Sequence, residues 1–294
     1  YKKNIVASST LQNYNSLRYH LFEFQKATKY ILNFDTINFD FFSKFQVYCI
    51  NQKLTNNYIK KLIKTLSAFM NFSSELNLCK NDNYKKFSGK IKVDDPTTFT
   101  ITYEEFEIIK NSSLTNKTLE KVRDVFVFLC LSGFDIKQIR NIKEEFIEKI
   151  PNSKFYNVKI FRKKTNKLIK EARLHEIAYN ILVDYNYFQD FMSDQRLNIY
   201  LKELAKELQL NRNLMTIKTI GNETTTEVRK VYELISSHWG RKFYVTYLKS
   251  NNVSNDIIAQ NTGRTSDKMI NYYDKRSQTQ KDISVLEKLE LFQN

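Results

Sequence analysis

Glycine and proline, the two residues that most often interrupt helices, are rare in this sequence, and their rarity restricts the folds that the chain can form. Only 5 glycines and 2 prolines occur among 294 residues. A β-sandwich or barrel needs many tight turns, and glycine and proline supply the backbone angles of such turns. Long helices need few of either residue, because both destabilise a helix interior. The sequence therefore favours a mainly α-helical protein, and its length is sufficient for two domains with separate cores.

The net charge is strongly positive, at +15, with 47 basic and 32 acidic side chains. Both parts of the chain are basic, since residues 1–98 carry 15 basic and 7 acidic side chains and the rest carries 32 and 25. Such an excess is typical of proteins that bind nucleic acid or an anionic membrane surface. No apolar run approaches the ~20 residues of a membrane span, and no signal-peptide or lipidation motif is visible. We therefore expect a nucleic-acid partner and no membrane association.

The cysteines and histidines do not suggest disulfides or a metal site. Three cysteines stand far apart among apolar residues, and none of the three histidines is near another histidine or a cysteine. An odd number of scattered cysteines fits reduced core residues of a cytosolic protein. The isolated histidines argue against zinc, so we expect no metal and no cofactor.

Residues 9–93 show helical periodicity. Apolar side chains recur at three- and four-residue spacing in three segments, which begin near Ser9, at residue 37 and at Thr55. Serine and threonine at such starts are good helix caps. The polar face of the third segment carries three lysines, which are Lys60, Lys61 and Lys64. A face that contacts only water explains them as well as contacts to DNA phosphates do, so both interpretations stay open.

The polar stretch 90–99 contains one of the two prolines and separates two helical patterns, which marks a domain boundary. We expect a helical domain over residues 1–95 and a second domain over 96–294. The second domain opens with Thr102–Glu105, the pattern of a capping box. A helix that is apolar on nearly all sides follows at 119–132 and is expected to be buried. Alternating apolar residues at 155–174, around the polar tip 163–167, predict a β-hairpin.

Four motifs of the second domain carry candidate chemistry, and each is weak alone. The first in chain order is the segment Ser132–Ile139, in which a buried helix ends at Gly133 and a new helix begins at once. The others are Lys164 at the hairpin tip, His238 with Arg241, and Gly263-Arg264 followed nine residues later by Tyr273. The spacing of His238 and Arg241 places them on one face of a helix that begins near Ser237. A lone histidine is usually structural, but an arginine one turn away at a helix N-terminus favours phosphate binding.

In this order the motifs resemble the tyrosine recombinase (phage integrase) family, and most closely the integrases of bacterial conjugative and mobilisable elements. Leu234–Phe243 and Ile258–Gly263 are particularly similar to that branch. The resemblance covers residues of about 100–290, and residues of about 8–95 resemble the helical SAM-like core-binding domain of the family. It implies a mainly α fold with a small β-hairpin or sheet, in which an α+β catalytic domain follows a helical DNA-binding domain.

The resemblance implies that DNA is broken and rejoined without metal, ATP or another cofactor. Tyr273 would attack a backbone phosphate and form a 3′-phosphotyrosine, with Tyr272 as the reserve nucleophile. Arg241 would bind two oxygens of the phosphorane-like transition state. His238 would be a hydrogen-bond donor or general base at the same phosphate, and Lys164 would protonate the leaving 5′ oxygen.

Two positions depart from the family pattern. The family has an arginine where this sequence has Asp135, and a carboxylate there repels a phosphodiester; losing one such donor costs roughly 10²–10³ in rate. Arg264 stands where the family has His or Trp, and an arginine can still donate to a phosphate. Three explanations stay open: Lys137, Arg140 or Arg123 has taken over the role, Arg264 compensates, or the protein is a weak or inactive recombinase kept as a DNA-binding module.

The implied partner is double-stranded DNA at attachment or inverted-repeat sites, bound mainly through phosphate contacts. Candidate contacts beside the catalytic set are Lys60, Lys61 and Lys64 in the first domain and Lys163, Lys167, Lys242 and Arg276 in the second. The amphipathic segment Ile283–Phe292 packs either into a neighbouring subunit, as in the family, or on its own domain. We expect a cytoplasmic, nucleoid-associated protein that is a monomer in solution and a tetramer of two dimers on DNA.

Overall fold

The chain divides into two compact units, one formed by Tyr1–Thr97 with Met215–Glu227 and the other by Thr98–Leu214 with Val228–Asn294. The computed structural model describes residues 8–87, 91–94, 99–162, 167–188, 191–263, 267–276 and 281. The division after residue 97 lies two residues beyond the expected boundary. The sequence did not lead us to expect that a segment from the later part of the chain belongs to the first unit. No helix among the described residues is long and apolar enough to span a membrane.

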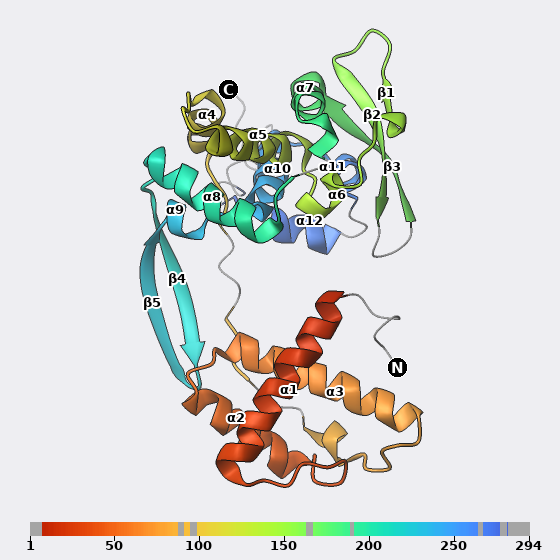
Figure 1. The fold of residues 1–294 in the computed structure, drawn as a ribbon, viewed down its shortest axis with the longest axis vertical. Helices are drawn as coiled ribbons and strands as arrows, with labels where there is room; N and C mark the ends of the chain where they lie inside the picture. Colours follow the sequence, from red (N-terminus) through yellow and green to blue (C-terminus); the bar gives the residue numbers. More distant parts are fainter. Residues whose placement is uncertain are drawn as a thin grey trace, which may run out of the picture. The chain divides into compact units, whose positions relative to one another are not determined.

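Helices of the first unit pack against one another (Figure 1), and the core between them is rich in aromatic side chains. These helices are α1 (Ser8–Thr28), α2 (Phe39–Asn51) and α3 (Asn56–Glu75), followed by the short 3-10 helix η1 (Asn83–Lys86). The ring of Phe24 is fully buried and meets the rings of Phe41 and Phe45 edge-to-face, at centroid distances of 5.6 and 5.5 Å. The side chain of Thr55 accepts the N–H of Tyr58. The predicted cap of the third helix is thereby confirmed.

A two-stranded hairpin contributes its far end to the first unit. Its strands are β4 (Asn213–Ile220) and β5 (Glu223–Lys230). Asn56 is 2% exposed; its amide nitrogen donates to the carbonyl oxygens of Gly221 and Lys92, and its oxygen accepts the Gly221 N–H, each at 2.8 Å. The carboxylate of Asp94 accepts the N–H of Thr219 at 2.8 Å and also its hydroxyl. These bonds fix the end of the hairpin to α3 and to the segment at residues 91–94.

The second unit is built around α5 (Lys117–Ser132), the predicted buried helix. It packs against four helices and one strand. The helices are α4 (Tyr103–Asn111), α7 (Glu176–Asp184), α8 (Asp194–Glu207) and α10 (His238–Ser250), and α9 (Val231–Leu234) packs on α8. The capping box predicted for Thr102 is present at the start of α4, because its side chain accepts the Glu105 N–H and the Glu105 carboxylate accepts the Thr102 N–H.

A three-stranded antiparallel sheet in the order β1-β2-β3 completes this unit. Its strands are β1 (Ile147–Lys149), β2 (Phe155–Arg162) and β3 (Lys167–His175). The β2–β3 hairpin is the predicted one, whereas β1 was not expected. The remaining elements are α6 (Ile136–Ile139), η2 (Glu144–Phe146), η3 (Asn186–Phe188), α11 (Asn255–Thr262) and α12 (Asp267–Tyr273). The observed fold is mainly helical with small antiparallel sheets, as expected.

Candidate functional site

Two close contacts between helices assemble the site in the second unit. A Cβ added at Gly240 would lie 2.7 Å from the Cβ of Leu129, so α10 crosses α5 at a distance that admits only glycine. At Gly133, where α5 ends in a left-handed conformation with φ +68°, a Cβ would lie 2.3 Å from the ring of Tyr244. This close packing brings Arg241, the residue after Gly240, to the end of α5.

Arg241 is 2% exposed and is held by groups at the end of α5 and the start of α6. Its Nε donates to the carbonyl oxygen of Gly133 at 2.7 Å, and its Nη2 donates to Oε1 of Gln138. Its Nη1 lies 3.6 Å from Oδ2 of Asp135. A buried guanidinium needs such partners, because an uncompensated buried charge is strongly destabilising. Gln138 is a partner of Arg241 that the sequence did not single out.

Asp135 has two structural roles. Its side chain caps α6 by accepting the N–H groups of Lys137 and Gln138, both at 3.0 Å, and Gln138 returns a bond to the Asp135 N–H. The same carboxylate faces the guanidinium of Arg241. A third of the Asp135 side chain is exposed. The carboxylate is therefore in contact with solvent on one side and with Arg241 on the other.

The structure brings Tyr273 together with His238. Their rings meet edge-to-face at a centroid distance of 5.3 Å, and Tyr273, the last residue of α12, is 3% exposed. Its neighbour Tyr272 is 41% exposed, and the ammonium group of Lys275 lies 4.4 Å from the centre of its ring. Because Arg241 lies one turn after His238 in α10, three of the predicted site residues share one place in the fold.

Two lysines add positive charge beside this site. Burial, and after it the charge of Lys275, lower the pKa of Lys242 to about 8. Burial also lowers the pKa of Lys275, as does the charge of Lys281, while Asp274 acts in the opposite direction. Ammonium groups with depressed pKa values are stabilised by an arriving anion.

Arg276, a predicted DNA contact, forms an ion pair at this end of the chain. Its Nη2 lies 2.9 Å from Oδ2 of Asp274. Burial acts to raise the pKa of Asp274, but the hydrogen bonds from Arg276 outweigh burial and lower it. Contact with a phosphate would therefore compete with this pair.

Three basic residues were proposed to take over the role of the family's arginine at position 135, and two of them have structural partners. Arg123 bonds to Asp124 at 2.7 Å and to the carbonyl oxygen of Ser112 at 2.6 Å. Arg140 bonds to Asp194 at 2.7 Å and to the carbonyl oxygen of Met192 at 2.8 Å. Lys137 is exposed at the start of α6. Among the three, Lys137 is the best placed to meet a ligand.

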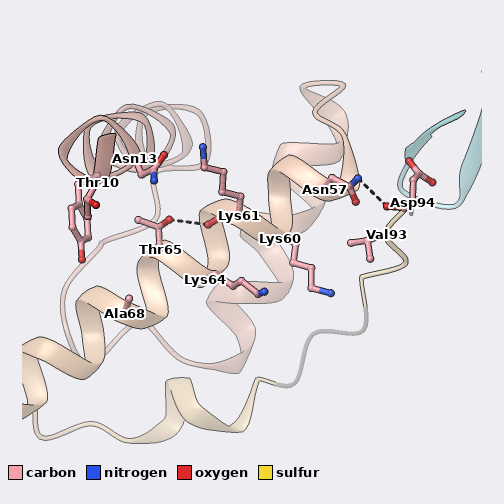
Figure 2. A pocket seen from close by; sticks show the side chains of 11 residues that line it. Thr10, Asn13, Asn57, Lys60, Lys61, Lys64, Thr65, Ala68, Val93 and Asp94 are labelled. Carbon is pink, nitrogen blue, oxygen red and sulfur yellow. Dashed lines mark hydrogen bonds between the residues drawn. The ribbon is translucent and has the colours of Figure 1, made fainter. Parts of the chain in front are cut away.

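In the first unit, the three predicted lysines Lys60, Lys61 and Lys64 line a groove of about 610 Å³ between α1 and α3 (Figure 2). Within the described chain, none of these lysines forms an ion pair. Asp94 also lines the groove, but its carboxylate oxygens bond to Thr219. The groove therefore presents a net positive charge, with three ammonium groups against one carboxylate.

Several predicted residues lie outside the described part of the chain. They are Lys163, Lys164, Arg264 and the segment Ile283–Phe292. Lys167 begins β3, and its side chain is not described. No cluster of three or more His, Cys, Asp or Glu side chains suited to a metal occurs among the described residues.

Comparisons with known proteins bear on both units. A family model described as the phage integrase SAM-like domain matches residues 1–93. No curated protein sequence matches this chain.

Solved structures share the fold of nearly the whole chain. Lambda integrase (75–356), in a dimer bound to a COC′ core site, matches with a TM-score of 0.67 at 14% identity, over 94% of this chain and 92% of that chain. The XerH site-specific recombinase bound to a palindromic difH substrate matches with a TM-score of 0.63 at 13% identity, over 93% and 78%. The Tn1549 transposon integrase (82–397) in complex with circular intermediate DNA matches with a TM-score of 0.63 at 10% identity, over 97% and 95%. At such low identities these matches establish the fold alone.

Proposed function

This chain has the fold of the tyrosine recombinases and begins with a phage integrase SAM-like domain, and from this premise we propose that it is a site-specific recombinase of double-stranded DNA. The observation that carries the proposal is the contact of Tyr273 with His238 on the helix that also holds Arg241. A nucleophile, a proton acceptor and a phosphate-binding cation are the groups that phosphoryl transfer to a tyrosine requires.

In the proposed reaction the hydroxyl oxygen of Tyr273 bonds to a backbone phosphorus as the bond to the 5′ oxygen breaks. His238 accepts the phenolic proton or donates to a non-bridging oxygen. Lys164 supplies the proton that the leaving 5′ oxygen takes up. A 5′ hydroxyl of another strand then reverses these steps, which rejoins the DNA and releases the tyrosine.

Arg241 would stabilise the additional negative charge of the transition state. The 3.6 Å separation between its Nη1 and Oδ2 of Asp135 exceeds hydrogen-bond length. A phosphate oxygen therefore has to compete with a loose ion pair rather than a tight one. The bonds to Gly133 and Gln138 would keep the guanidinium oriented during that exchange.

A second candidate function is a DNA-binding protein of the same fold with weak or no cleavage activity. The Asp135–Arg241 pair favours it, because the carboxylate neutralises the cation that the reaction needs and repels a phosphate. Lys137 and Arg264 are the residues we propose as compensating cations if cleavage does occur. In both functions the groove lined by Lys60, Lys61 and Lys64 would bind DNA phosphates.

One experiment separates the two functions. The binding site is first selected from a random duplex library, and a nicked suicide substrate containing it is then incubated with the protein. A recombinase forms a protein–DNA adduct that survives denaturant, whereas a binding module forms none on a site that it demonstrably binds. The variant Tyr273→Phe abolishes the adduct and Tyr272→Phe does not. The reverse pattern would transfer the nucleophile to Tyr272.

We also propose that the protein assembles on DNA as a tetramer of two dimers and acts in the cytoplasm near the nucleoid. The structure of lambda integrase as a dimer on a core site supports a multimeric complex. Sedimentation of the free protein and of its complex with the selected duplex tests the assembly. A complex that contains one protein chain per site at every protein concentration would refute it.

A further inference from the structure

We propose that Thr246 is a positioning residue for the nucleophile, an inference that rests on the proposed function. Thr246 lies in α10, the helix that carries His238 and Arg241. Its hydroxyl donates to the carbonyl oxygen of Tyr273 at 3.2 Å and accepts the N–H of Lys275 at 3.0 Å. One side chain thus binds the main chain on both sides of the point where α12 ends.

These contacts satisfy main-chain groups that a helix end leaves without partners. The last carbonyls of a helix have no partner within it, and α12 ends at Tyr273. A hydroxyl can donate one hydrogen bond and accept others at the same time. Valine has nearly the same shape as threonine but can do neither. The double contact therefore requires a hydroxyl at position 246.

The direction of the Thr246 hydroxyl is unusual for a helix. Serine and threonine inside helices commonly bond to the carbonyl four residues earlier. Ser250, one turn further along α10, does this, with its hydroxyl donating to the carbonyl oxygen of Thr246 at 3.0 Å. Thr246 instead bonds to another segment of the chain. The same helix thus offers a matched control.

The position of the contact determines how the nucleophile meets the rest of the site. His238 and Thr246 are eight residues apart, or about 12 Å along the helix. The ring of Tyr273 rests against His238 while its carbonyl is bound to Thr246. Both the ring and the carbonyl of the nucleophilic residue are therefore held by α10. Thr246 thereby fixes the position of the end of α12 along α10, the helix that carries Arg241. A displacement of about 1 Å can lower a rate about 100-fold.

Three variants test this role in single-turnover cleavage of the nicked suicide substrate at saturating DNA. Thr246→Val is expected to lower the rate constant of adduct formation about 10- to 100-fold, while the Kd for the selected duplex and the thermal unfolding temperature stay close to those of the native protein. Thr246→Ser is expected to restore most of the rate because it keeps the hydroxyl. Ser250→Ala is expected to cleave at the native rate.

Native-rate cleavage by Thr246→Val, or equally slow cleavage by Thr246→Ser, would overturn the proposal. So would a fall in DNA affinity or unfolding temperature that accounts for the lost rate. A readout independent of cleavage is amide hydrogen exchange of the peptide that contains Lys275, which is expected to accelerate in Thr246→Val and not in Ser250→Ala. If the native protein forms no adduct, the proposed function fails, but this exchange still decides whether Thr246 holds the main chain. Unchanged exchange would refute that contact.

Discussion

Replacing Asp135 by asparagine separates the two roles of this carboxylate. An asparagine oxygen can still accept the N–H groups of Lys137 and Gln138, because asparagine and aspartate are comparable helix caps. The substitution removes the negative charge that faces Arg241 and leaves an amide NH2 group in the place of Oδ2. Asp135→Ala is the matched comparison, because it removes the charge and the cap together.

The magnitude follows from the geometry. Two unit charges separated by 3.6 Å attract by about 4–5 kcal/mol at an effective dielectric constant of ~20. Because a third of the Asp135 side chain is exposed, solvent screening reduces the effect to about 1–2 kcal/mol. Asp135→Asn should therefore lower the free energy of unfolding by about that amount, since Arg241 loses its anionic partner. A bound phosphate takes the place of that partner, so DNA affinity should rise about 5- to 30-fold.

Fluorescence anisotropy of the selected duplex measures the affinity, and thermal unfolding with and without DNA measures the stability. We expect Asp135→Asn to be less stable alone and to gain more stability from DNA than the native protein does. Asp135→Ala should lose about a further 1 kcal/mol of stability, which is the usual value of a helix cap. If Asp135→Asn is destabilised but binds DNA no more tightly, no phosphate reaches Arg241. That result would refute the proposed role of Arg241 in binding the phosphate of the recombinase reaction.

Three further measurements test other parts of the molecule. Lys64→Ala is expected to lower the slope of log affinity against log salt concentration by about 1, because one phosphate contact is lost. Lys80→Ala, which lies outside the groove, is the control. Equal slopes for the two variants would show that the groove does not contact DNA. Asn56→Ala removes a buried amide that makes three hydrogen bonds, two of them to the end of the β4–β5 hairpin. It should lower the free energy of unfolding of the first unit by about 2–4 kcal/mol in urea, and a loss below about 0.5 kcal/mol would show that these bonds do not hold the hairpin. Lys242→Met should raise the free energy of unfolding at pH 7 by about 1–2 kcal/mol, because burial and Lys275 lower the pKa of Lys242 to about 8 and the folded state disfavours its charged form. The penalty in the native protein is fully present below pH 8 and disappears as the pH rises towards 10.5, the ordinary value. The advantage of the variant should therefore shrink over that range, and an advantage that grows with pH would contradict the cause.

The elements that the sequence predicted well are those fixed by local chemistry. Thr55 and the Thr102–Glu105 box start helices because each side chain bonds to backbone only three residues away. Gly133 ends α5 because it alone tolerates the left-handed conformation required there without cost. The β2–β3 hairpin was visible because its buried face makes the sequence alternate between apolar and polar residues.

The β4–β5 hairpin was missed for the opposite reason. Most of its side chains are exposed, so no buried face imposes an alternating pattern on the sequence. Its position depends on bonds between its end and Asn56 or Asp94, which lie more than 120 residues earlier. Asparagine and aspartate near a domain boundary ordinarily indicate loops and caps. No local signal distinguishes the ones that hold a distant hairpin.

In the candidate site, too, the sequence predicted the local relations between residues but not the contacts between distant ones. Spacing along α10 was enough to pair His238 with Arg241, because helical geometry alone relates them. The contacts of Arg241 with Gln138 and of Thr246 with Tyr273 join residues 103 and 27 positions apart. Such contacts depend on how closely α10 crosses α5 and α12. For the crossing of α10 and α5, the signal in the sequence was two glycines, Gly133 and Gly240. A glycine does not by itself indicate which helix will approach it.

The partners of Arg241 explain why the negative charge of one side chain, Asp135, can decide between the two proposed functions. Among the described residues, the guanidinium bonds to a carbonyl and an amide, which are neutral, and faces the charged carboxylate of Asp135. The neutral partners orient the group without cancelling its field, so they are compatible with phosphate binding. Asp135 cancels part of that field, yet it is the partner that lies beyond hydrogen-bond length and is partly exposed to solvent. The site therefore holds an oriented cation whose compensating charge an incoming phosphate would have to replace. In the proposed recombinase, the extent of that replacement would set the cleavage activity.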